Sequence, residues 1–299
     1  LAIFREEVKF MHLLLTGDTH GDNVHRFSYK YHPNLRKLTN EDAIIMLGDT
    51  AFGWPGFEKE NKYNLDYMAT KPWTFICIRG NHDVTPVWRN SKPISQYRNI
   101  KCLDGTLSQL VYNECLYKNI LLVSDTALLQ IGEYTALCFG GSDSHDADNL
   151  AYPFEKEKIK FFKKSHQYFR IVNKTWWVDE KLNIPYAESL LSYHGLRPSY
   201  LNYVKEPKDK KIKVDFIFTH DCPARLLYLY SFSDKGRLKP TEGELFLDNV
   251  ANHVDFKWFV HGHMHIDHRY DNKFLCLYKN ILEIPSSDVL EETYNWNIV

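Results

Sequence analysis

Several short groups of Asp, Asn and His residues lie along the chain, and these residue types are those of metal ligands. Asp18 and His20 are two residues apart, so on an extended segment their side chains point the same way and can bind one ion. His263 and His265 have the same spacing near the other end of the chain. This pattern predicts a metal site assembled from distant parts of the sequence.

Three further residues extend this set to seven candidate ligands. Asp49 has two carboxylate oxygens that can bridge a pair of ions, Asn81 offers a neutral oxygen, and His220 offers a ring nitrogen. Mixed nitrogen and oxygen ligands suit two borderline ions such as Mn²⁺, Fe or Zn²⁺, and they suit Ca²⁺ poorly. A two-metal site can hold a bridging hydroxide and polarise a phosphoryl oxygen for in-line attack, so the predicted chemistry is hydrolysis of phosphate esters.

Apolar runs of strand length precede most of these groups. They cover residues 12–16, 43–47, 74–78, 135–139, 215–218 and 257–260. The runs lack the polar alternation of a half-exposed strand, so each is predicted to be a strand buried on both faces. Ligand sites in open α/β sheets lie at the carboxyl ends of strands. The runs therefore place the polar groups at one edge of an α/β fold.

Two segments between the strands are predicted helices, residues 61–70 and 241–253. Thr241 and Glu244 fit a capping box at the start of the second helix, and its expected inner face is Leu245, Val250 and Val254.

The rest of the chain is organised around these elements. Residues 145–213 are rich in Lys, Tyr, Trp and Phe and interrupt the strand rhythm, which predicts an insertion or cap near the active site. We expect a single domain over residues 1–299, with residues 1–10 as an extension before Met11.

The composition narrows the class of protein. Lys and Arg number 37 and Asp and Glu number 38, so a net charge of −1 does not indicate binding to nucleic acid or to an anionic membrane. Hydrophobic residues make up 44% and charged residues 25%, which excludes global disorder. No apolar stretch approaches the length of a membrane span, and residues 1–10 contain no secretory signal. The six cysteines form no C-x-x-C pair, which favours reduced thiols and a cytoplasmic location.

The ordered motifs resemble the calcineurin-like metallophosphoesterase superfamily. Its pattern of D-x-H, G-D, G-N-H-[DE], a lone His after a strand, and G-H-x-H is present here in that order, at residues 18–20, 48–49, 80–83, 220 and 262–265. The chain is most similar to a bacterial and phage branch of uncharacterised metallophosphoesterases. That resemblance lies in residues 17–22, 176–180 and 219–223 and in Gly140, Gly141, Ser144 and Asp146.

The resemblance implies a fold and a division of the ligands. The fold would be a four-layer α/β/β/α sandwich with an insertion, in which two sheets face each other and helices cover both outer faces. Two divalent or trivalent ions would be bound, with manganese favoured and iron or zinc as alternatives. One ion would be held by Asp18, His20, His265 and Asp49, and the second by Asp49, Asn81, His220 and His263.

The resemblance also implies roles in catalysis. A metal-bridging hydroxide would attack phosphorus in a phosphate mono- or diester, and His82 would contact the phosphate and protonate the leaving group as general acid. Asp83 would hold the ring of His82, and Arg79 would contact a phosphate oxygen. Gly141 and His145 are candidate substrate contacts, because a Gly140–Gly141 turn lets backbone approach a phosphate and His145 lies beside it.

One departure from the family and two alternative functions bear on the substrate. The second motif reads Gly48-Asp49-Thr50-Ala51-Phe52-Gly53-Trp54, without the phosphate-binding Arg of the family's phosphoprotein phosphatases. A substrate of that type is therefore not favoured. The alternatives are a nuclease or RNA-processing phosphodiesterase, for which the aromatic and Lys-rich insertion would supply a local groove, and a non-catalytic metal-binding scaffold.

Overall fold

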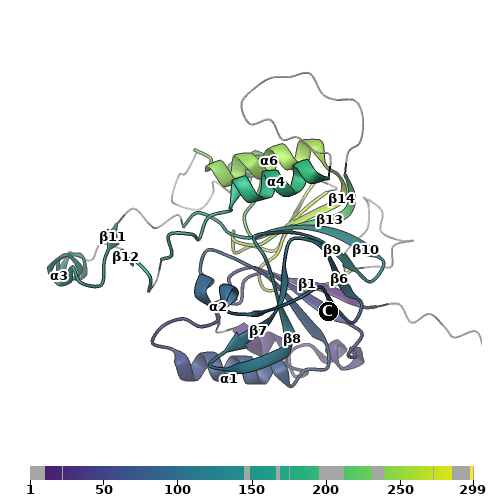
Figure 1. Cartoon of the computed structure of the whole chain (residues 1–299), viewed down its shortest axis with the longest axis horizontal. Helices are drawn as coiled ribbons and strands as arrows, with labels where there is room; N and C mark the ends of the chain where they lie inside the picture. Colours follow the sequence, from purple (N-terminus) through teal and green to yellow (C-terminus); the bar gives the residue numbers. More distant parts are fainter. Residues whose placement is uncertain are drawn as a thin grey trace, which may run out of the picture.

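The computed structural model describes residues 11–21, 23–144, 149–165, 169–174, 176–194, 212–230, 239–271, 273–284 and 297–298. Two eight-stranded sheets form the centre of the molecule and face each other, with helices outside them (Figure 1). The six predicted strands are all present within these two sheets.

The first sheet contains the strands from the N-terminal part of the chain. Its central strands β1, β2, β3 and β8 are parallel neighbours, with β17 antiparallel to β1 and β7 antiparallel to β8. The order is β18 (Asn297–Ile298), β17 (Ile281–Glu283), β1 (Leu13–Thr16), β2 (Ala43–Leu47), β3 (Thr74–Ile78), β8 (Cys115–Val123), β7 (Leu107–Tyr112) and β4 (Lys92–Ile94).

The second sheet also has a parallel centre, formed by β10, β13, β14 and β16, which antiparallel strands flank. The order is β15 (His268–Tyr270), β16 (Phe274–Cys276), β14 (Asp255–His261), β13 (Lys213–Thr219), β10 (Tyr134–Phe139), β9 (Thr126–Ile131), β6 (Ile100–Asp104) and β5 (Gln96–Tyr97).

Helices and short elements connect the strands. The α-helices are α1 (Glu58–Ala69), α2 (Thr85–Arg89), α3 (Lys156–Lys164), α4 (Ile184–Tyr193), α5 (Leu227–Tyr230) and α6 (Glu242–His253). The 3₁₀ helices are η1 (Asn23–Phe27), η2 (Pro33–Lys37) and η3 (Ala224–Leu226), and β11 (Leu150–Ala151) pairs with β12 (Arg170–Ile171) in a small separate sheet.

The central strands are apolar over the stretches where both of their faces are buried. In β1, Leu13 and Leu15 point into the core between the two sheets, whereas Leu14 packs on the other side beneath the helices. In β13, Phe216 and Phe218 face the same inter-sheet core, and Ile217 packs against α4 and α6. Three apolar clusters thus separate four layers, which confirms the predicted α/β/β/α sandwich.

Both predicted helices are present, with one correction on the second. Thr241 caps α6 in a capping box with Glu244, as expected. Val250 and Val254 are buried, but Leu245 is 48% exposed and its prediction as an inner-face residue was wrong. Phe246 and Leu247 are buried in its place, so the apolar face of the helix is centred about one residue further along.

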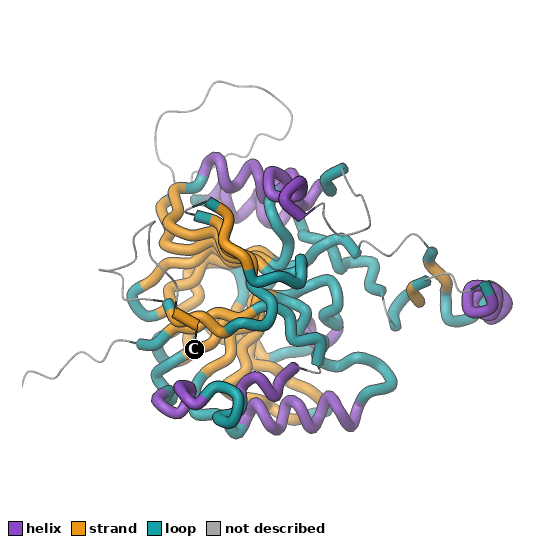
Figure 2. Tube along the Cα trace, turned by 180° about the vertical axis from the view of Figure 1, so that it is seen from behind, coloured by secondary structure: helices purple, strands orange, loops and turns teal. Residues whose placement is uncertain are grey.

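The predicted insertion over residues 145–213 has two different parts. The part that contains β11, α3 and β12 projects away from the sheets (Figures 1 and 2). Helix α4, in contrast, packs beside α6 in the outer layer and buries Ala187, Leu190 and Leu191 in the core. Residues 195–211 lie outside the described part of the chain.

Two further expectations can be compared with the described residues. None of the helices in these ranges is long and apolar enough to span a membrane. All six cysteines lie in described segments and are free thiols, four of them buried.

Candidate metal centre

The structure brings all seven predicted metal ligands together at the carboxyl ends of strands from both sheets. Asp18, Asp49 and Asn81 follow β1, β2 and β3 of the first sheet. His220 follows β13 of the second sheet, and the segment after β14 carries His263 and His265. His20 completes the set beside Asp18. Each ligand therefore starts from a buried, hydrogen-bonded strand that fixes its backbone.

Asp18, His20 and His265 form one group. Nε2 of His20 lies 2.9 Å from Nε2 of His265, and Nε2 of His265 lies 3.2 Å from Oδ2 of Asp18. Nε2 of His20 is 3.7 Å from the same Asp18 oxygen. Three potential ligand atoms therefore face one small space.

The remaining ligands form a second group around the buried ring of His220. Nε2 of His220 lies 3.0 Å from Oδ1 of Asn81, 3.2 Å from Nδ1 of His263 and 3.4 Å from Oδ1 of Asp49. Nδ1 of His220 lies 2.8 Å from the carbonyl oxygen of Leu47, so a proton on Nδ1 leaves Nε2 as the coordinating atom.

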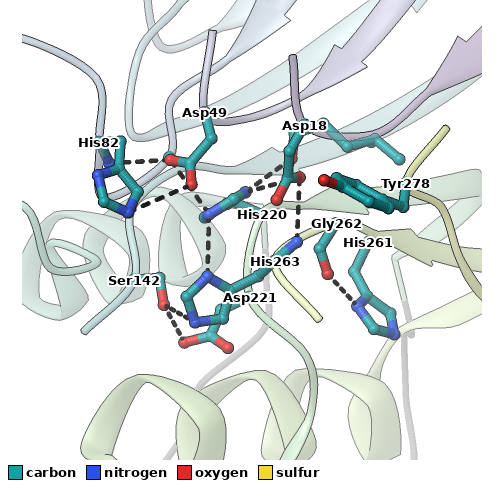
Figure 3. A network of polar contacts seen from close by, with 12 residues as sticks. Asp18, Asp49, His82, Ser142, His220, Asp221, His261, Gly262, His263 and Tyr278 are labelled. Atoms are coloured by element: carbon teal, nitrogen blue, oxygen red, sulfur yellow. Dashed lines mark hydrogen bonds and ion pairs between the residues drawn. The ribbon is translucent and has the colours of Figure 1, made fainter. Parts of the chain in front are cut away.

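The carboxylate of Asp49 faces both groups, and in Figure 3 it lies between His82 and His220. Its Oδ1 faces His220, whereas its Oδ2 is 3.9 Å from Nε2 of His20. A single carboxylate thus offers one oxygen to each group, which is the arrangement expected of a bridging ligand.

The donor set fits metal ions better than it fits hydrogen bonds. Ligand atoms about 2.1 Å from one ion lie roughly 3 to 4.2 Å from each other, and the distances within the two groups run from 2.9 to 3.9 Å. If the neutral His220 ring carries its proton on Nδ1, the lone pair on its Nε2 faces a lone pair on Oδ1 of Asn81. These two lone pairs repel each other unless a cation binds between them. Oδ2 of Asp18 is buried and has no hydrogen-bond partner within the described part of the chain. An ion would satisfy these atoms.

The backbone at the ligands is unusual as well. His20, Asp49, His263 and His265 all have positive φ, at 48°, 48°, 66° and 53°. Residues other than glycine rarely adopt this conformation, and such residues cluster at functional sites, where the surrounding structure holds them.

Gly48 in the second motif is required for close approach. Its φ is +92°, and a Cβ at this position would overlap the imidazole of His220. The G-D pattern in the sequence therefore has a steric cause, because only glycine lets His220 lie against the strand end that carries Asp49.

The charges of the protein groups alone also favour a cation here. Burial opposes protonation of His220, but the carboxylates of Asp49 and Asp18 outweigh it and raise the pKa of His220 to about 10. Burial would raise the pKa of Asp49, yet the neighbouring His220 and His82 lower it well below its usual value. The site therefore attracts positive charge. A bound divalent ion would supply this charge in place of the proton on His220.

His82 lies beside His20 and Asp49 and is partly exposed. Its side chain is 18% exposed, and Nε2 is 4.0 Å from Oδ2 of Asp49. Nη2 of Arg170, from the projecting segment, lies 3.5 Å from the same nitrogen. Burial and the nearby charge of Arg170 lower the pKa of His82, against the opposite effect of Asp49. A cation from the insertion thus lies beside His82.

Asp83 differs from its implied role. Its carboxylate accepts hydrogen bonds from the hydroxyl of Thr50 at 2.5 Å and from the backbone N–H groups of Ala51 and Gly80 at 2.9 and 2.7 Å. These partners tie the loop after β2 to the loop after β3. The expectation that Asp83 holds the ring of His82 was wrong, because its oxygens point into the buried turn.

Arg79 also points away from the ligands. Its Nε donates to Asp125 at 2.5 Å, and its two terminal nitrogens donate to the carbonyl oxygens of Glu180 and Lys181. The side chain is buried. Arg79 therefore links β3 to the segment before α4 and does not contact the metal centre, contrary to the expected phosphate contact.

Of the two candidate substrate contacts, only Gly141 can be compared with the structure, and its geometry does not support the contact. Gly141 has a φ of +92°, but the backbone that approaches it is that of Glu180 and Lys181, which a Cβ would overlap. Close packing of two protein segments explains this glycine. His145 lies outside the described residues.

The sequence analysis missed several polar residues behind the ligands. Arg26 is buried and donates to the carbonyl oxygens of Asp18 and Tyr278 at 2.8 and 2.6 Å. Nothing in its local sequence distinguishes it from a surface arginine. Ser144 and Glu180 belong to motifs noted above, and Ser144 contacts both Asn81 and Glu180, but their spacing alone indicates no role.

The four-layer sandwich and the converging His, Asp and Asn side chains define a metal-dependent phosphoesterase. The family model described as calcineurin-like phosphoesterase matches residues 11–267, so the chain belongs to the calcineurin-like phosphoesterase family.

Comparison with solved structures gives distant neighbours. Phosphopantetheinyl hydrolase from Mycobacterium tuberculosis is 12% identical, with 90% of each chain covered and a TM-score of 0.35. A protein of unknown function from Aquifex aeolicus is 15% identical, with 58% of this chain and 84% of that chain covered and a TM-score of 0.24. Comparison with curated proteins gives no match.

Proposed function

We propose that this protein hydrolyses phosphate mono- or diesters with two bound metal ions, Mn²⁺ being preferred, and that it acts in the cytoplasm. When bound, the ions would polarise the phosphate and activate a water molecule as nucleophile. One ion would be held by Asp18, His20 and His265, the second by Asn81, His220 and His263, and both by Asp49. The six free cysteines support a reducing compartment.

The observation that carries this proposal is the position of Asp49. Its two oxygens face different ligand groups, at 3.4 Å from His220 and 3.9 Å from His20. A site for one ion would not need the second oxygen to face another set of nitrogens. This geometry supports a pair of ions that share one carboxylate, which is the arrangement that in-line attack on phosphorus uses.

His82 is proposed as the general acid. In the free protein, burial and Arg170 favour its neutral form. A phosphate group bound beside its ring would raise the pKa of His82, because the anion stabilises the imidazolium and offsets the charge of Arg170. Protonated His82 would then contact a phosphate oxygen and protonate the leaving oxygen, and Arg170 would balance the charge of the bound phosphate.

The test is a metal-dependent assay with simple substrates. Protein stripped with a chelator should hydrolyse neither an aryl phosphate monoester nor an aryl phosphate diester, and Mn²⁺ should restore turnover of at least one. Asp49→Asn should reduce turnover to background even with Mn²⁺, because the amide weakens both ligand groups. Asp66→Asn, on the surface of α1, is the matched control and should retain full turnover.

Three outcomes would count against this proposal. Turnover that survives both metal stripping and Asp49→Asn would exclude the two-metal mechanism. Metal-loaded protein without turnover of either ester would favour the scaffold alternative. Cleavage of oligonucleotides with a steep dependence on salt would favour the nuclease alternative.

A further inference from the structure

The loop that follows β10 carries two serines, and each lies between a buried carboxylate and a metal ligand. Ser144 lies between Glu180 and Asn81, and Ser142 lies between Asp221 and His263. Both carboxylates are buried. The two ligands reached in this way belong to the same group, the one centred on His220.

The contacts of Ser144 have a fixed direction. Its backbone N–H and its hydroxyl both donate to the carboxylate of Glu180, each at 2.8 Å. A carboxylate can only accept, so the hydroxyl oxygen is left as the acceptor for Asn81, whose Nδ2 donates to it at 3.0 Å. An Asn side chain has one nitrogen and one oxygen, and this contact turns the oxygen toward His220 and the ion.

The contacts of Ser142 have the same direction. Its hydroxyl donates to Oδ2 of Asp221 at 2.8 Å, and its oxygen lies 3.3 Å from Nε2 of His263 (Figure 3). Because the hydroxyl proton is directed to Asp221, Nε2 of His263 must carry the proton that Ser142 accepts. Nδ1 of His263 then carries the lone pair. Nδ1 is also the atom that faces His220, at 3.2 Å.

We propose that Ser142 and Ser144 are positioning residues. Each donates its hydroxyl proton to a buried carboxylate, Asp221 or Glu180, and therefore accepts a hydrogen bond from a metal ligand, His263 or Asn81. This contact determines which atom of each ligand faces one of the ions. This inference rests on the proposed two-metal function. Among the described residues, no serine links a buried carboxylate to a ligand in the group of Asp18, His20 and His265. Residues behind a metal ligand commonly change affinity by about 10- to 100-fold when they are removed.

Loss of each serine hydroxyl has a different consequence for the metal ligand that it contacts. In Ser144→Ala, the amide of Asn81 loses the contact that distinguishes its nitrogen from its oxygen. In Ser142→Ala, the proton of His263 can move to Nδ1, which blocks the coordinating atom. Both changes weaken one ion site and leave the other ligand group as it is.

The test is a calorimetric titration of the metal-free full-length protein with Mn²⁺ alone, in weakly alkaline buffer. Wild-type protein should bind two ions. Ser142→Ala and Ser144→Ala should each lower the affinity for one ion by about 10- to 100-fold and leave the other unchanged. Ser144→Thr keeps the hydroxyl and should restore the affinity.

Ser91→Ala is the matched control. Ser91 is also a buried serine that donates to a carbonyl, of Val87 at 2.7 Å, and accepts from a backbone N–H, but it lies away from the ligands. Both Mn²⁺ affinities should be unchanged in this variant.

The outcomes separate this inference from the proposed function. Wild-type affinities for both ions in the two alanine variants, or an equal loss at both sites, would overturn the role of the serines. If these variants do not fold, Glu180→Gln supplies the second test, because its amide can donate to Ser144 and remove the fixed direction of that hydrogen bond. An unchanged affinity there would likewise overturn it. Binding of two ions without ester hydrolysis would instead overturn only the proposed function, and no Mn²⁺ binding by wild-type protein would overturn both.

Discussion

Asp83 shows how a residue beside the proposed general acid can stabilise the site without touching it. Its carboxylate accepts three hydrogen bonds from Thr50, Ala51 and Gly80 inside the protein. Two of the partners belong to the loop that follows Asp49, and the third precedes Asn81. Asp83 therefore fixes the backbone on which two ligands stand.

Replacing this carboxylate should reduce stability. In Asp83→Asn, an amide N–H₂ group faces at least one buried donor, and the unsatisfied groups should lower the free energy of unfolding by about 1 to 3 kcal/mol. Urea unfolding of the metal-free protein measures this change, and Asp66→Asn should stay within about 0.5 kcal/mol of wild type. Lost turnover with unchanged stability would instead support contact with the ring of His82.

Arg79 can be tested in the same way. Arg79→Met removes the donors to Asp125 and to the carbonyl oxygens of Glu180 and Lys181. We expect a loss of about 1 to 3 kcal/mol in the free energy of unfolding, with unchanged inhibition of turnover by inorganic phosphate. Weaker phosphate inhibition at unchanged stability would restore a substrate role for Arg79.

At the scale of the elements, the strand ends determine the site. β1, β2 and β3 are parallel neighbours, so their carboxyl ends deliver Asp18, Asp49 and Asn81 to one edge of the first sheet. The parallel pair β13 and β14 delivers His220 and His263 to the facing edge of the second sheet. The loops between the strands and the ligands are short. Gly48, at the end of β2, lets the ring of His220 pack against that strand end.

Gly48→Ala tests this close approach. The added Cβ would displace the ring of His220, so we expect loss of Mn²⁺ binding at the second ligand group in addition to backbone strain. Gly56→Ala is a matched control, because Gly56 has a similar φ of +87° with no atom within 4 Å of its Cβ position. It should lose about 1 to 2 kcal/mol of stability and keep both ions. Calorimetric Mn²⁺ titration of both variants decides the matter, and intact binding in Gly48→Ala would refute the steric argument.

At the scale of the whole molecule, the metal centre joins the two sheets. One sheet supplies Asp18, Asp49 and Asn81, and the other supplies His220 and the segment with His263 and His265. Apolar packing between the sheets holds these edges together. Metal binding should therefore stabilise the packed molecule as a unit.

This coupling predicts a thermal shift. At a free Mn²⁺ concentration of 100 times Kd, each bound ion adds about 2.7 kcal/mol to the free energy of unfolding. With an unfolding entropy of about 2.1 cal/mol/K per residue, this raises the melting temperature by about 4 °C for each ion. Differential scanning calorimetry with and without Mn²⁺ measures the shift. Asp49→Asn should show little of it, and an equal shift in that variant would mean that Mn²⁺ binds elsewhere.

The strands, the candidate ligands and the family pattern could all be predicted from the amino-acid sequence. The strands were predictable because burial on both faces produces apolar runs such as 43–47 and 74–78. The candidate ligands were predictable because each one lies within four residues of the end of its strand. These are local properties of the chain, so the spacing of residues carries them.

The directions of the supporting side chains depend on the fold and could not be predicted from the sequence. Asp83 and Arg79 lie within the third motif or next to it, yet their partners are Thr50 and Asp125, 33 and 46 residues away in the chain. Ser144 meets Glu180 across 36 residues, and Arg170 meets His82 across 88. Such contacts depend on which segments pack together, and a side chain in a buried turn follows the nearest unsatisfied donor or acceptor rather than its neighbour in sequence.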